Sequence, residues 1–513
     1  MNYGPQTAEV FAAMGGQLPT PDALFYEVIE QRQIIAKKSE VISEQQKHIA
    51  LLEERIRLLQ AQRFGRSSEK SEAQIELFDP EAPPPVVPAE PAPKVKKRAP
   101  RKGLPENLPR ETIYLRLSEE QKAGAIDTFF VKVKEELDII PAQVRVLEYL
   151  QEKAVFVDQG QRRRVEAERP RHPLGKAIVS VSLLAYLIVA KYCDGLPLYR
   201  LEGILTRYGG SLSRTAFAHW LIKLSLQLQP LINLMREEQL SADYLQGDET
   251  RIKVLKEPGL KASSHKWMWI MRGGPPDRPV VLFDYDRSRG KAVAQRLLED
   301  FDGRYFQSDG YSGYDAVCLK KGIVHLGCWD HARRKFDAAI KAQAPTATAT
   351  PSKADQALVM INALYGIERE IKALTVEEKY HQRQQRSVPA LQELHRWLLD
   401  QAPTLMKGGK TREAVDYALN QWPKLIRYCD HGQLLISNIL AENAVRPLAI
   451  GRKAWLFCDT PAGARASASY YSLVETAKAN GLEPYAYLCK VIRQLPYAET
   501  VEDMEALLPW NIK

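Results

Sequence analysis

The sequence has little cysteine: six residues in a chain of 513, with no Cys-x-x-Cys pair. Such scattered cysteines exclude a disulfide framework and give no signature of a zinc site built from cysteines. A long apolar run is also missing, because the longest one, residues 177–190, is too short to span a bilayer and predicts a buried helix. The N-terminus lacks the basic start and apolar stretch of a signal peptide, so a cytoplasmic protein is expected. The cysteines are Cys193, Cys318, Cys328, Cys429, Cys458 and Cys489.

Acidic charge is in modest deficit, with 72 Lys and Arg against 63 Asp and Glu and a formal net charge of +9. An excess of this size favours a polyanionic partner such as nucleic acid. The remaining composition, 45% hydrophobic and 26% charged residues, is that of a globular protein long enough for several domains. We therefore predict a multidomain α+β protein.

Residues 22–63 predict one long helix with an apolar residue at every seventh position. β-branched residues along this seam favour a parallel two-stranded coiled coil, so the segment is interpreted as a dimerisation helix. The alternative is an amphipathic helix that packs on its own chain. The seam consists of Val28, Ile35, Ile42, Ile49 and Ile56, with Leu52 and Leu59 adding a second seam.

The segment that follows, 64–103, is rich in proline and ends in the basic run KVKKRAPRK. It predicts a disordered linker that either contacts phosphates nonspecifically or only keeps the chain soluble. Residues 104–170 contain four short strand candidates, TIYLRL, FFVKVKEEL, QVRVLEYL and KAVFV. This part is interpreted as a small β-rich DNA-binding domain.

Residues 171–240 show a helical pattern. Within them, 198–228 reads as a helix, a break at Gly209-Gly210 and a second helix with an apolar face. This order is typical of a helix-turn-helix, in which Arg214 and Thr215 at the start of the second helix would reach DNA. Helical hairpins with a glycine turn are common, so this signal needs support from elsewhere.

From residue 244 the pattern changes to strands: three strand candidates, a helix, a strand, a helix and a fifth strand. That order is typical of an RNase H-like mixed sheet. We expect its first part at 241–340, a helical insertion at 341–430, a returning core helix at 431–460, and a C-terminal helical region at 461–513.

Three acids are candidates for metal-dependent phosphoryl transfer, which needs carboxylates that converge from different elements. Asp248 is expected on the first strand and Asp309 just after the fourth, its neighbour in such a sheet. Glu442 lies in 436–446, a predicted short helix ended or kinked by Pro447. Each Asp is equally compatible with a turn or cap, and Glu442 with an ion pair to Arg446. Spacing alone does not decide between these readings.

The stretch GCWDHARRKF offers further candidates. Cys328 and His331 resemble half of a metal site, but no second half is visible in the sequence. His331 is expected either to contact a phosphate or the attacking water, or to cap the next helix. Basic residues around this stretch and around Glu442 are candidates for binding the DNA backbone, namely Arg333, Arg334, Lys335, Arg446, Arg452 and Lys453.

Several ordered motifs decide between these readings. RFGRSSEK, IIPAQVRVLEY, GDETRIKVL, SDGYSGYDAV, GCWDHARRKF and LAENAVRPLAIGRKAWLF resemble the DDE transposases of the insertion-sequence-66 family. The resemblance implies an RNase H-like catalytic domain that uses Mg²⁺ or Mn²⁺, with the triad on Asp248, Asp309 and Glu442. It also implies binding of terminal inverted repeats and target DNA, a homodimer or higher multimer, accessory proteins, and work at a bacterial nucleoid.

The sequence departs from the family pattern at two places. The cysteines expected around IIPAQVRV are absent, so no zinc is predicted there. Before Glu442 the usual Asp-Asn-Asn reads Ser437-Asn438-Ile439. Because the Asp is missing, we expect Asn438 and its neighbours to hold the Glu442 carboxylate differently than in the family. The alternatives are a weak or inactive transposase-derived DNA-binding protein, a nuclease without strand transfer, and a coiled-coil scaffold for proteins.

Overall fold

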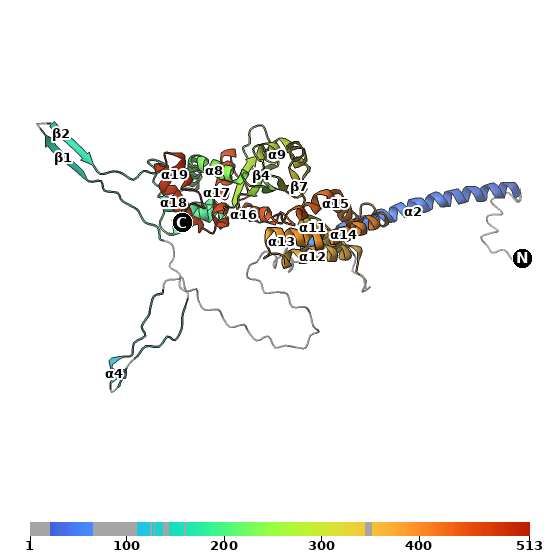
Figure 1. Ribbon diagram of the computed structural model, residues 1–513, viewed down its shortest axis with the longest axis horizontal. Helices are drawn as coiled ribbons and strands as arrows, with labels where there is room; N and C mark the ends of the chain where they lie inside the picture. Colours follow the sequence, from blue (N-terminus) through green and yellow to red (C-terminus); the bar gives the residue numbers. More distant parts are fainter. Residues whose placement is uncertain are drawn as a thin grey trace, which may run out of the picture. The chain divides into compact units, whose positions relative to one another are not determined.

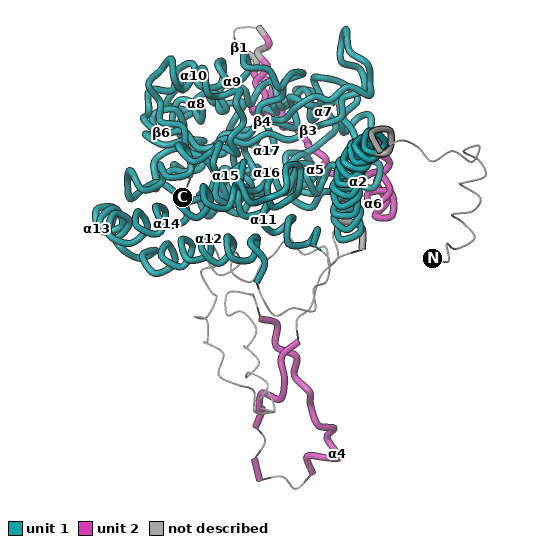
Figure 2. Tube along the Cα trace, turned by 90° about the vertical axis from the view of Figure 1, so that its right-hand side faces the viewer, with its two compact units in different colours: residues 1–80, 170–201, 214–513 teal, residues 81–169, 202–213 magenta. Residues whose placement is uncertain are grey.

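The computed structural model describes residues 21–64, 110–123, 126–127, 129–136, 143–158, 161–343 and 351–512. The chain divides into two compact units, coloured separately in Figure 2. Unit 1 comprises residues 1–80, 170–201 and 214–513, and unit 2 comprises residues 81–169 and 202–213. Apart from Phe64, the predicted linker 64–103 lies outside the described residues.

The long N-terminal helix exists as α2 (Pro21–Phe64). Its apolar seam is exposed along the whole length, from 51% of Val28 to 60% of Ile35. Only its C-terminal part packs on the rest of unit 1. There Arg57 Nε donates to the Ala342 carbonyl over 2.9 Å, and Glu54 accepts from the Lys410 amide over 2.9 Å. Packing on its own chain therefore accounts for the end of α2, whereas pairing with a second copy stays a prediction.

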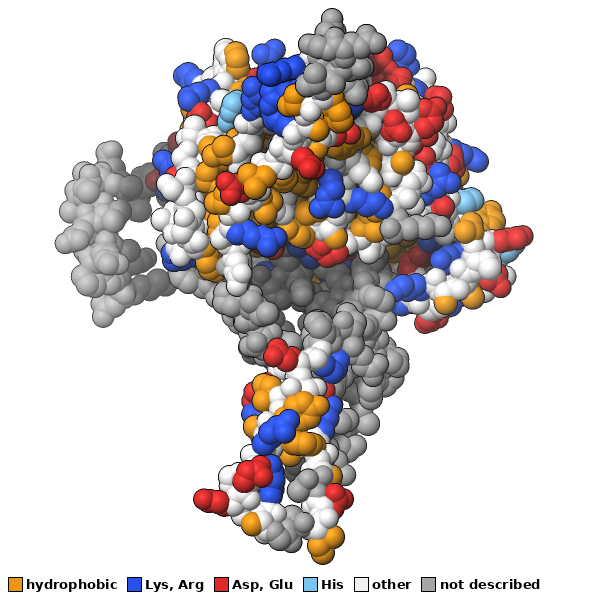
Figure 3. All heavy atoms as spheres, turned by 90° about the vertical axis from the view of Figure 1, so that its left-hand side faces the viewer, with side chains coloured by type: hydrophobic (Ala, Val, Ile, Leu, Met, Phe, Trp, Pro, Cys, Tyr) orange, Lys and Arg blue, Asp and Glu red, His pale blue; other side chains and the backbone are white. Residues whose placement is uncertain are grey.

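Unit 2 differs from the expected β-rich domain. Its described strands are β1 (Lys153–Asp158) and β2 (Gln161–Glu166), which form an antiparallel hairpin, and its first helix is α4 (Glu119–Lys122). KAVFV is thus a strand as predicted, but 112–117, 129–136 and 143–150 form none. Their apolar side chains are exposed, and Figure 3 shows apolar side chains mixed with charged ones on the part of the chain that carries α4. The prediction of strands there is wrong because alternation marks a strand only where a partner strand supplies the hydrogen bonds.

Four helices of the described chain come directly before the five-stranded sheet: α5 (Val181–Tyr192), α6 (Leu198–Arg207), α7 (Arg214–Gln227) and α8 (Gln229–Leu240). The apolar run at 177–190 is mostly the buried helix α5, as expected. Gly209, at φ +86°, provides the left-handed backbone that ends α6. α7 begins at Arg214 and buries Phe217, so both predicted helices of the helix-turn-helix segment exist. No helix among the described residues is long and apolar enough to cross a membrane.

The predicted succession of strands and helices in the sheet is confirmed (Figure 1). The spatial order is β5-β4-β3-β6-β7, with β3, β6 and β7 parallel and β4 and β5 antiparallel to their neighbours. The elements are β3 (Tyr244–Ile252), β4 (Lys266–Gly273), β5 (Val280–Asp286), α9 (Lys291–Leu297), β6 (Tyr305–Gln307), α10 (Asp315–Lys321) and β7 (Val324–Leu326).

Helices cover the sheet. Side chains of α9 and α10 pack with Leu245, Met271 and Phe306 into one buried cluster. At the edge strand β5, α17 (Pro461–Ala479) supplies the missing hydrogen-bond partners: the Val281 amide donates to Thr476 Oγ1 over 3.0 Å, and the Phe283 amide to Ser472 Oγ over 2.8 Å. An edge that is satisfied in this way is closed to pairing with another strand.

Between β7 and the last core helix the described chain is helical, as predicted for the insertion. Four of its helices bury one common core around Trp329, Phe336 and Leu394, namely α11 (Trp329–Ala342), α12 (Lys353–Glu370), α14 (Val388–Gln401) and α15 (Lys410–Leu425). Between α12 and α14 lie α13 (Val376–Gln382) and a π-helical turn (Arg383–Ser387), which contribute no side chain to that core.

The helix that carries Glu442 is longer than predicted. α16 runs over Ile439–Trp455, so the expectation that it ends at Pro447 is wrong. A proline removes one backbone donor, and burial of Val445 and Leu448 on either side holds the helix together across it. The chain then ends in α17, α18 (Pro484–Gln494) and α19 (Val501–Glu505).

Candidate active site

Asp248 lies on β3, and Asp309 lies two residues beyond the end of β6, the parallel neighbour of β3. The pairing of β3 with β6 ends with Gln246 opposite Gln307, and each Asp follows its Gln by two residues. Gly247 makes this approach possible, because a Cβ there would lie 2.6 Å from the ring of Phe306. The sequence prediction of neighbouring strand positions for the two acids is thus confirmed.

The loop after β6 fixes Asp309 by its backbone and its carboxylate. Asp309 Oδ1 accepts from the Tyr311 amide over 2.9 Å, and its carbonyl accepts from the Tyr417 hydroxyl over 2.9 Å. Gly310 has φ +91°, and a Cβ there would lie 2.7 Å from Gln421. The turn therefore needs glycine for its conformation and for space.

Two buried glutamines join the sheet to the start of α16. Gln246 is 3% exposed and Gln307 is fully buried. Gln246 Nε2 donates to Gln307 Oε1 over 2.9 Å and to the Ser437 carbonyl over 3.2 Å, and its Oε1 accepts from the Ala441 amide. Gln307 Nε2 donates to the carbonyls of Gly327 and Leu435. This network sets the position of the helix that carries Glu442.

Ser437 stands where the family pattern has Asp, whereas Asn438 keeps the Asn of that pattern, and both residues are fully buried. The side-chain amide of Asn438 (Nδ2) donates to the Gly247 carbonyl over 3.4 Å, and the backbone carbonyl of Asn438 accepts from the backbone amide of Glu442 over 3.1 Å. Asn438 therefore links the first turn of α16 to the strand position before Asp248. The Ser437 hydroxyl has no hydrogen-bond partner among the described residues.

Glu442 faces α11 rather than its own helix. Both of its carboxylate oxygens accept from Arg334 Nη2, and His331 Nδ1 lies 3.4 Å from Oε1. Cys328 Sγ lies 4.0 Å from the same oxygen. Among the described residues the ion-pair partner of Glu442 is thus Arg334, with His331 as a close polar neighbour, and the alternative of an ion pair with Arg446 is wrong.

A second acid on β3 was missed by the sequence reasoning. The Glu249 side chain is 1% exposed and binds Arg289, whose Nε donates over 2.8 Å. Arg289 Nη2 also lies 4.0 Å from Asp309 Oδ2, and its guanidinium packs 4.1 Å from the centroid of the Tyr311 ring. In the sequence, the only indication of this ion pair is the second acid that directly follows Asp248 in the motif GDETR. Arg289 could not be found in this way, because it lies on a loop that is distant in the sequence.

Burial and the closeness of other carboxylates together shift the pKa values of the candidate acids. Burial raises the pKa of Asp248 well above its usual range, and repulsion by Glu442, Glu249 and Asp309 raises it further. Burial also raises the pKa of Glu442, although Arg334 opposes this shift. Burial and the nearby Arg334 lower the pKa of His331 to about 4, so its imidazole is neutral at pH 7.

Mutual repulsion of this kind is what a divalent cation relieves, and oxygen donors suit Mg²⁺ or Mn²⁺. Asp248, Asp309 and Glu442 therefore fit a hard divalent metal by donor type. In the described residues, however, the closest group of three potential ligands is Cys328, His331 and Glu442, whose ligand atoms lie within 4.8 Å of one another. In this structure two arginines compensate part of the negative charge: Arg334 binds Glu442, and Arg289 lies near Asp309.

The predicted DNA-binding residues are distributed over several surfaces. Arg333 donates to Asn362 over 3.0 Å, and Lys335 lies 4.6 Å from the Tyr417 ring centroid. Arg452 donates to Thr250 Oγ1 over 2.7 Å on β3, so it lies beside the strand of Asp248. Exposed side chains at the predicted positions are those of Arg214, Thr215, Arg334, Lys335, Arg446 and Lys453.

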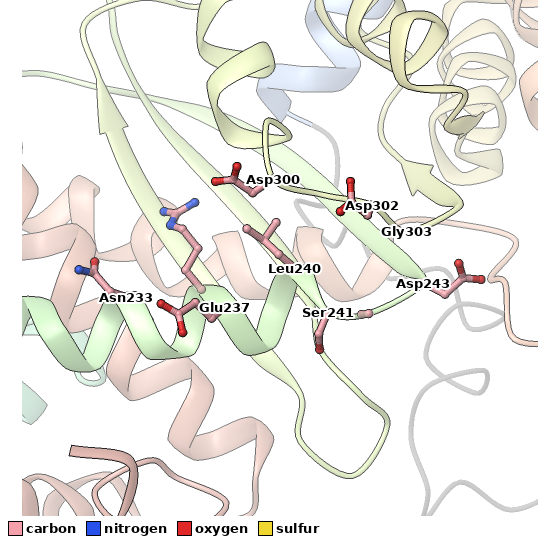
Figure 4. A pocket seen from close by; sticks show the side chains of 10 residues that line it. Asn233, Glu237, Leu240, Ser241, Asp243, Asp300, Asp302 and Gly303 are labelled. Atoms are coloured by element: carbon pink, nitrogen blue, oxygen red, sulfur yellow. The ribbon is translucent and has the colours of Figure 1, made fainter. Parts of the chain in front are cut away.

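A surface hollow lies at the end of α8. Figure 4 shows Glu237, Asp243, Asp300 and Asp302 around it. None of the three candidate acids lines this hollow. Its acidic rim repels phosphates, so it offers no surface for nucleic acid.

Comparison with known families gives the identity of the chain. The model of the transposase IS66 family matches residues 176–466, which include α5, the whole sheet, the helical insertion and all three acids. The chain belongs to the IS66 family of transposases. Two further models match this IS66 transposase: the IS66 C-terminal element over residues 472–510, and "Transposase C of IS166 homeodomain" over residues 51–113. The latter covers the end of α2 and a segment that is mostly outside the described residues.

Relatives of the IS66 transposase occur in Sinorhizobium fredii (strain NBRC 101917 / NGR234). "Uncharacterized protein y4qI" is 30% identical over 81% of this chain and 78% of its own length. "Uncharacterized protein y4jD" is 29% identical over 80% of this chain and 81% of its own length. No solved structure matches. Membership in the family makes this chain a transposase, an enzyme of DNA cleavage and strand transfer that uses a divalent metal.

Proposed function

We propose that Asp248, Asp309 and Glu442 are the catalytic acids of this transposase and that they hold Mg²⁺ or Mn²⁺ while DNA strands are cut and joined. The observation that carries the proposal is that three acids from distant parts of the sequence are held by neighbouring elements. Asp248 lies on β3 and Asp309 follows its parallel neighbour β6, while the start of α16, which carries Glu442, is hydrogen-bonded to β3 through Gln246 and Asn438. Repulsion by Glu442 and Asp309 adds to the effect of burial on the pKa of Asp248. The strand order β5-β4-β3-β6-β7, with its parallel and antiparallel pairs, supports an RNase H-like catalytic domain.

When bound, the metal would supply an activated water and neutralise charge on the phosphoryl group. The chain provides the positions. Asp248 on β3, Asp309 just after β6 and Glu442 on α16 would hold the metal, and Arg334 would have to leave Glu442 for this. Arg334, half exposed, then has its charge free for a DNA phosphate. Neutral His331 is suited to accept a hydrogen bond from the attacking water or hydroxyl.

The rest of the proposed function concerns DNA and assembly. Arg214 and Thr215 at the start of α7 would contact the terminal inverted repeats, together with unit 2 and the basic linker. Arg333, Lys335, Arg446, Arg452 and Lys453 would contact the DNA backbone around the acids. The exposed apolar seam of α2 supports dimerisation as a coiled coil, since so many aligned apolar side chains rarely face water.

The test is metal-dependent nicking of DNA that carries the two ends of the element. We expect Asp248→Asn, Asp309→Asn and Glu442→Gln each to lower cleavage by at least about 1000-fold while end binding in a gel-shift assay is retained. Asp284→Asn is the matched control, because Asp284 lies on β5 and pairs with Arg236 and Arg296. End binding without cleavage by the unaltered chain would instead identify an inactive DNA-binding derivative, and cleavage that survives Glu442→Gln would exclude the triad.

A further inference from the structure

A second set of metal donors meets at Glu442. Cys328 precedes the first residue of α11 and His331 follows three positions later, so their side chains lie on one face of the helix start. Glu442 reaches the pair from α16. One ligand atom from each of the three residues, the Cys328 sulfur, a ring nitrogen of His331 and a carboxylate oxygen of Glu442, lies within 4.8 Å of the other two.

These distances are close to those of a tetrahedral zinc centre. Zn–S bonds of about 2.3 Å and Zn–N or Zn–O bonds of about 2.0–2.1 Å put neighbouring ligand atoms about 3.3–3.6 Å apart. The distance from Nδ1 to Oε1 is 3.4 Å, and that from Sγ to Oε1 is 4.0 Å. A small movement of the Cys328 or Glu442 side chain would shorten the distance from Sγ to Oε1 enough for all three donors to bind one ion.

The chemistry of the donors also selects the metal. One sulfur, one imidazole nitrogen and one carboxylate oxygen suit Zn²⁺, whereas Mg²⁺ requires oxygen ligands in octahedral geometry. The Nδ1 atom of His331 is buried and has no hydrogen-bond partner among the described residues. The Cys328 thiol is 1% exposed, and a thiol in such a place binds metal with release of its proton.

We propose that Cys328, His331 and Glu442 form a binding site for Zn²⁺, and that zinc there withdraws Glu442 from the catalytic acids and inhibits DNA cleavage. Arg334 is the competitor of the ion, since it binds both Glu442 oxygens in the structure. Its side chain is 51% exposed, so it can leave without disturbing the core. The zinc site stands on its own geometry, and only the inhibition rests on the proposed function.

Binding is tested with the full-length, metal-depleted chain and Co²⁺ as the probe, followed by displacement with Zn²⁺. We expect one equivalent of tetrahedral Co²⁺ with a thiolate-to-cobalt charge-transfer band. Cys328→Ser should abolish that band, and His331→Gln should weaken binding at least about tenfold. Cys318→Ser is the matched control, because Cys318 is also buried but lies on α10 outside the cluster. Arg334→Gln should tighten binding.

A chain that shows no thiolate band, or that binds Co²⁺ equally well after Cys328→Ser and His331→Gln, overturns the proposal. Circular dichroism of each variant shows whether a lost band reflects a lost fold, and His331→Gln decides if Cys328→Ser does not fold. In the nicking assay with Mg²⁺, one equivalent of Zn²⁺ should lower cleavage at least about tenfold in the unaltered chain and in Cys318→Ser, but not in Cys328→Ser. If no variant cuts DNA, the proposed function fails while the cobalt spectrum still decides the zinc site.

Discussion

Replacement of Gln307 by Met tests whether the buried glutamine network holds the active site together. Gln307 is fully buried between β6 and the start of α16, and it both donates and accepts hydrogen bonds. Met keeps the volume but leaves the Gly327 carbonyl and the Tyr244 hydroxyl each short of a partner. Each buried polar group without its partner costs about 1–3 kcal/mol, so the free energy of unfolding should fall by about 2–6 kcal/mol.

Urea denaturation followed by circular dichroism measures this loss. Gln295→Met is the control, because Gln295 is exposed on α9 and its replacement should change the free energy of unfolding by less than about 0.5 kcal/mol. The rate of DNA nicking by folded Gln307→Met should fall as well, since the start of α16 loses its tie to the sheet. Equal stability of the two variants would refute the assigned role of the network.

Three further predictions concern charge and assembly. Burial and neighbouring acids raise the pKa of Asp248 in the folded chain, so its ionised form destabilises the fold at neutral pH and this cost disappears as pH falls below the unfolded pKa. Asp248→Asn should therefore raise the melting temperature at pH 7 and leave it unchanged at acidic pH; a lower melting temperature at pH 7 would contradict the sign. Arg289→Ala should lower the free energy of unfolding by about 1–3 kcal/mol, because it leaves the Glu249 carboxylate buried without its cation, and Glu249→Gln in the same chain should restore part of the loss. Ile35→Asp with Ile42→Asp should shift the sedimenting species of the full chain toward the monomer, and an unchanged dimer would exclude the α2 seam as its interface.

The order of strands and helices in the core could be predicted from sequence because each element has its own local pattern of apolar residues. The placement of Asp248 and Asp309 followed from that order, since parallel neighbours in a sheet bring their ends together. Glu442 required the family motifs, because no local pattern relates a helix at 439 to a strand at 248. The prediction of a strand at 112–117 was wrong for a related reason. Alternation of apolar and polar residues does not by itself supply the partner strand that must provide the hydrogen bonds.

The contacts of the site could not be predicted. Arg446 stands one turn from Glu442 in sequence, yet Arg334 of another helix binds the acid. The half-site of Cys328 and His331 showed no completion in the sequence because its third donor comes from a different element. Such pairings depend on how helices pack across a sheet, and packing is determined by the whole core rather than by short stretches.

The central claim is that Asp248, Asp309 and Glu442 hold one metal site. The most direct measurement replaces Mg²⁺ with Fe²⁺ and maps, by mass spectrometry, where hydroxyl radicals generated at the bound iron cut the polypeptide. Cuts should cluster near residues 248, 309 and 438–442, excess Mg²⁺ should suppress them, and Asp248→Asn should abolish them. If the cuts that excess Mg²⁺ suppresses lie at other places, or if they persist unchanged in Asp248→Asn, the claim is contradicted.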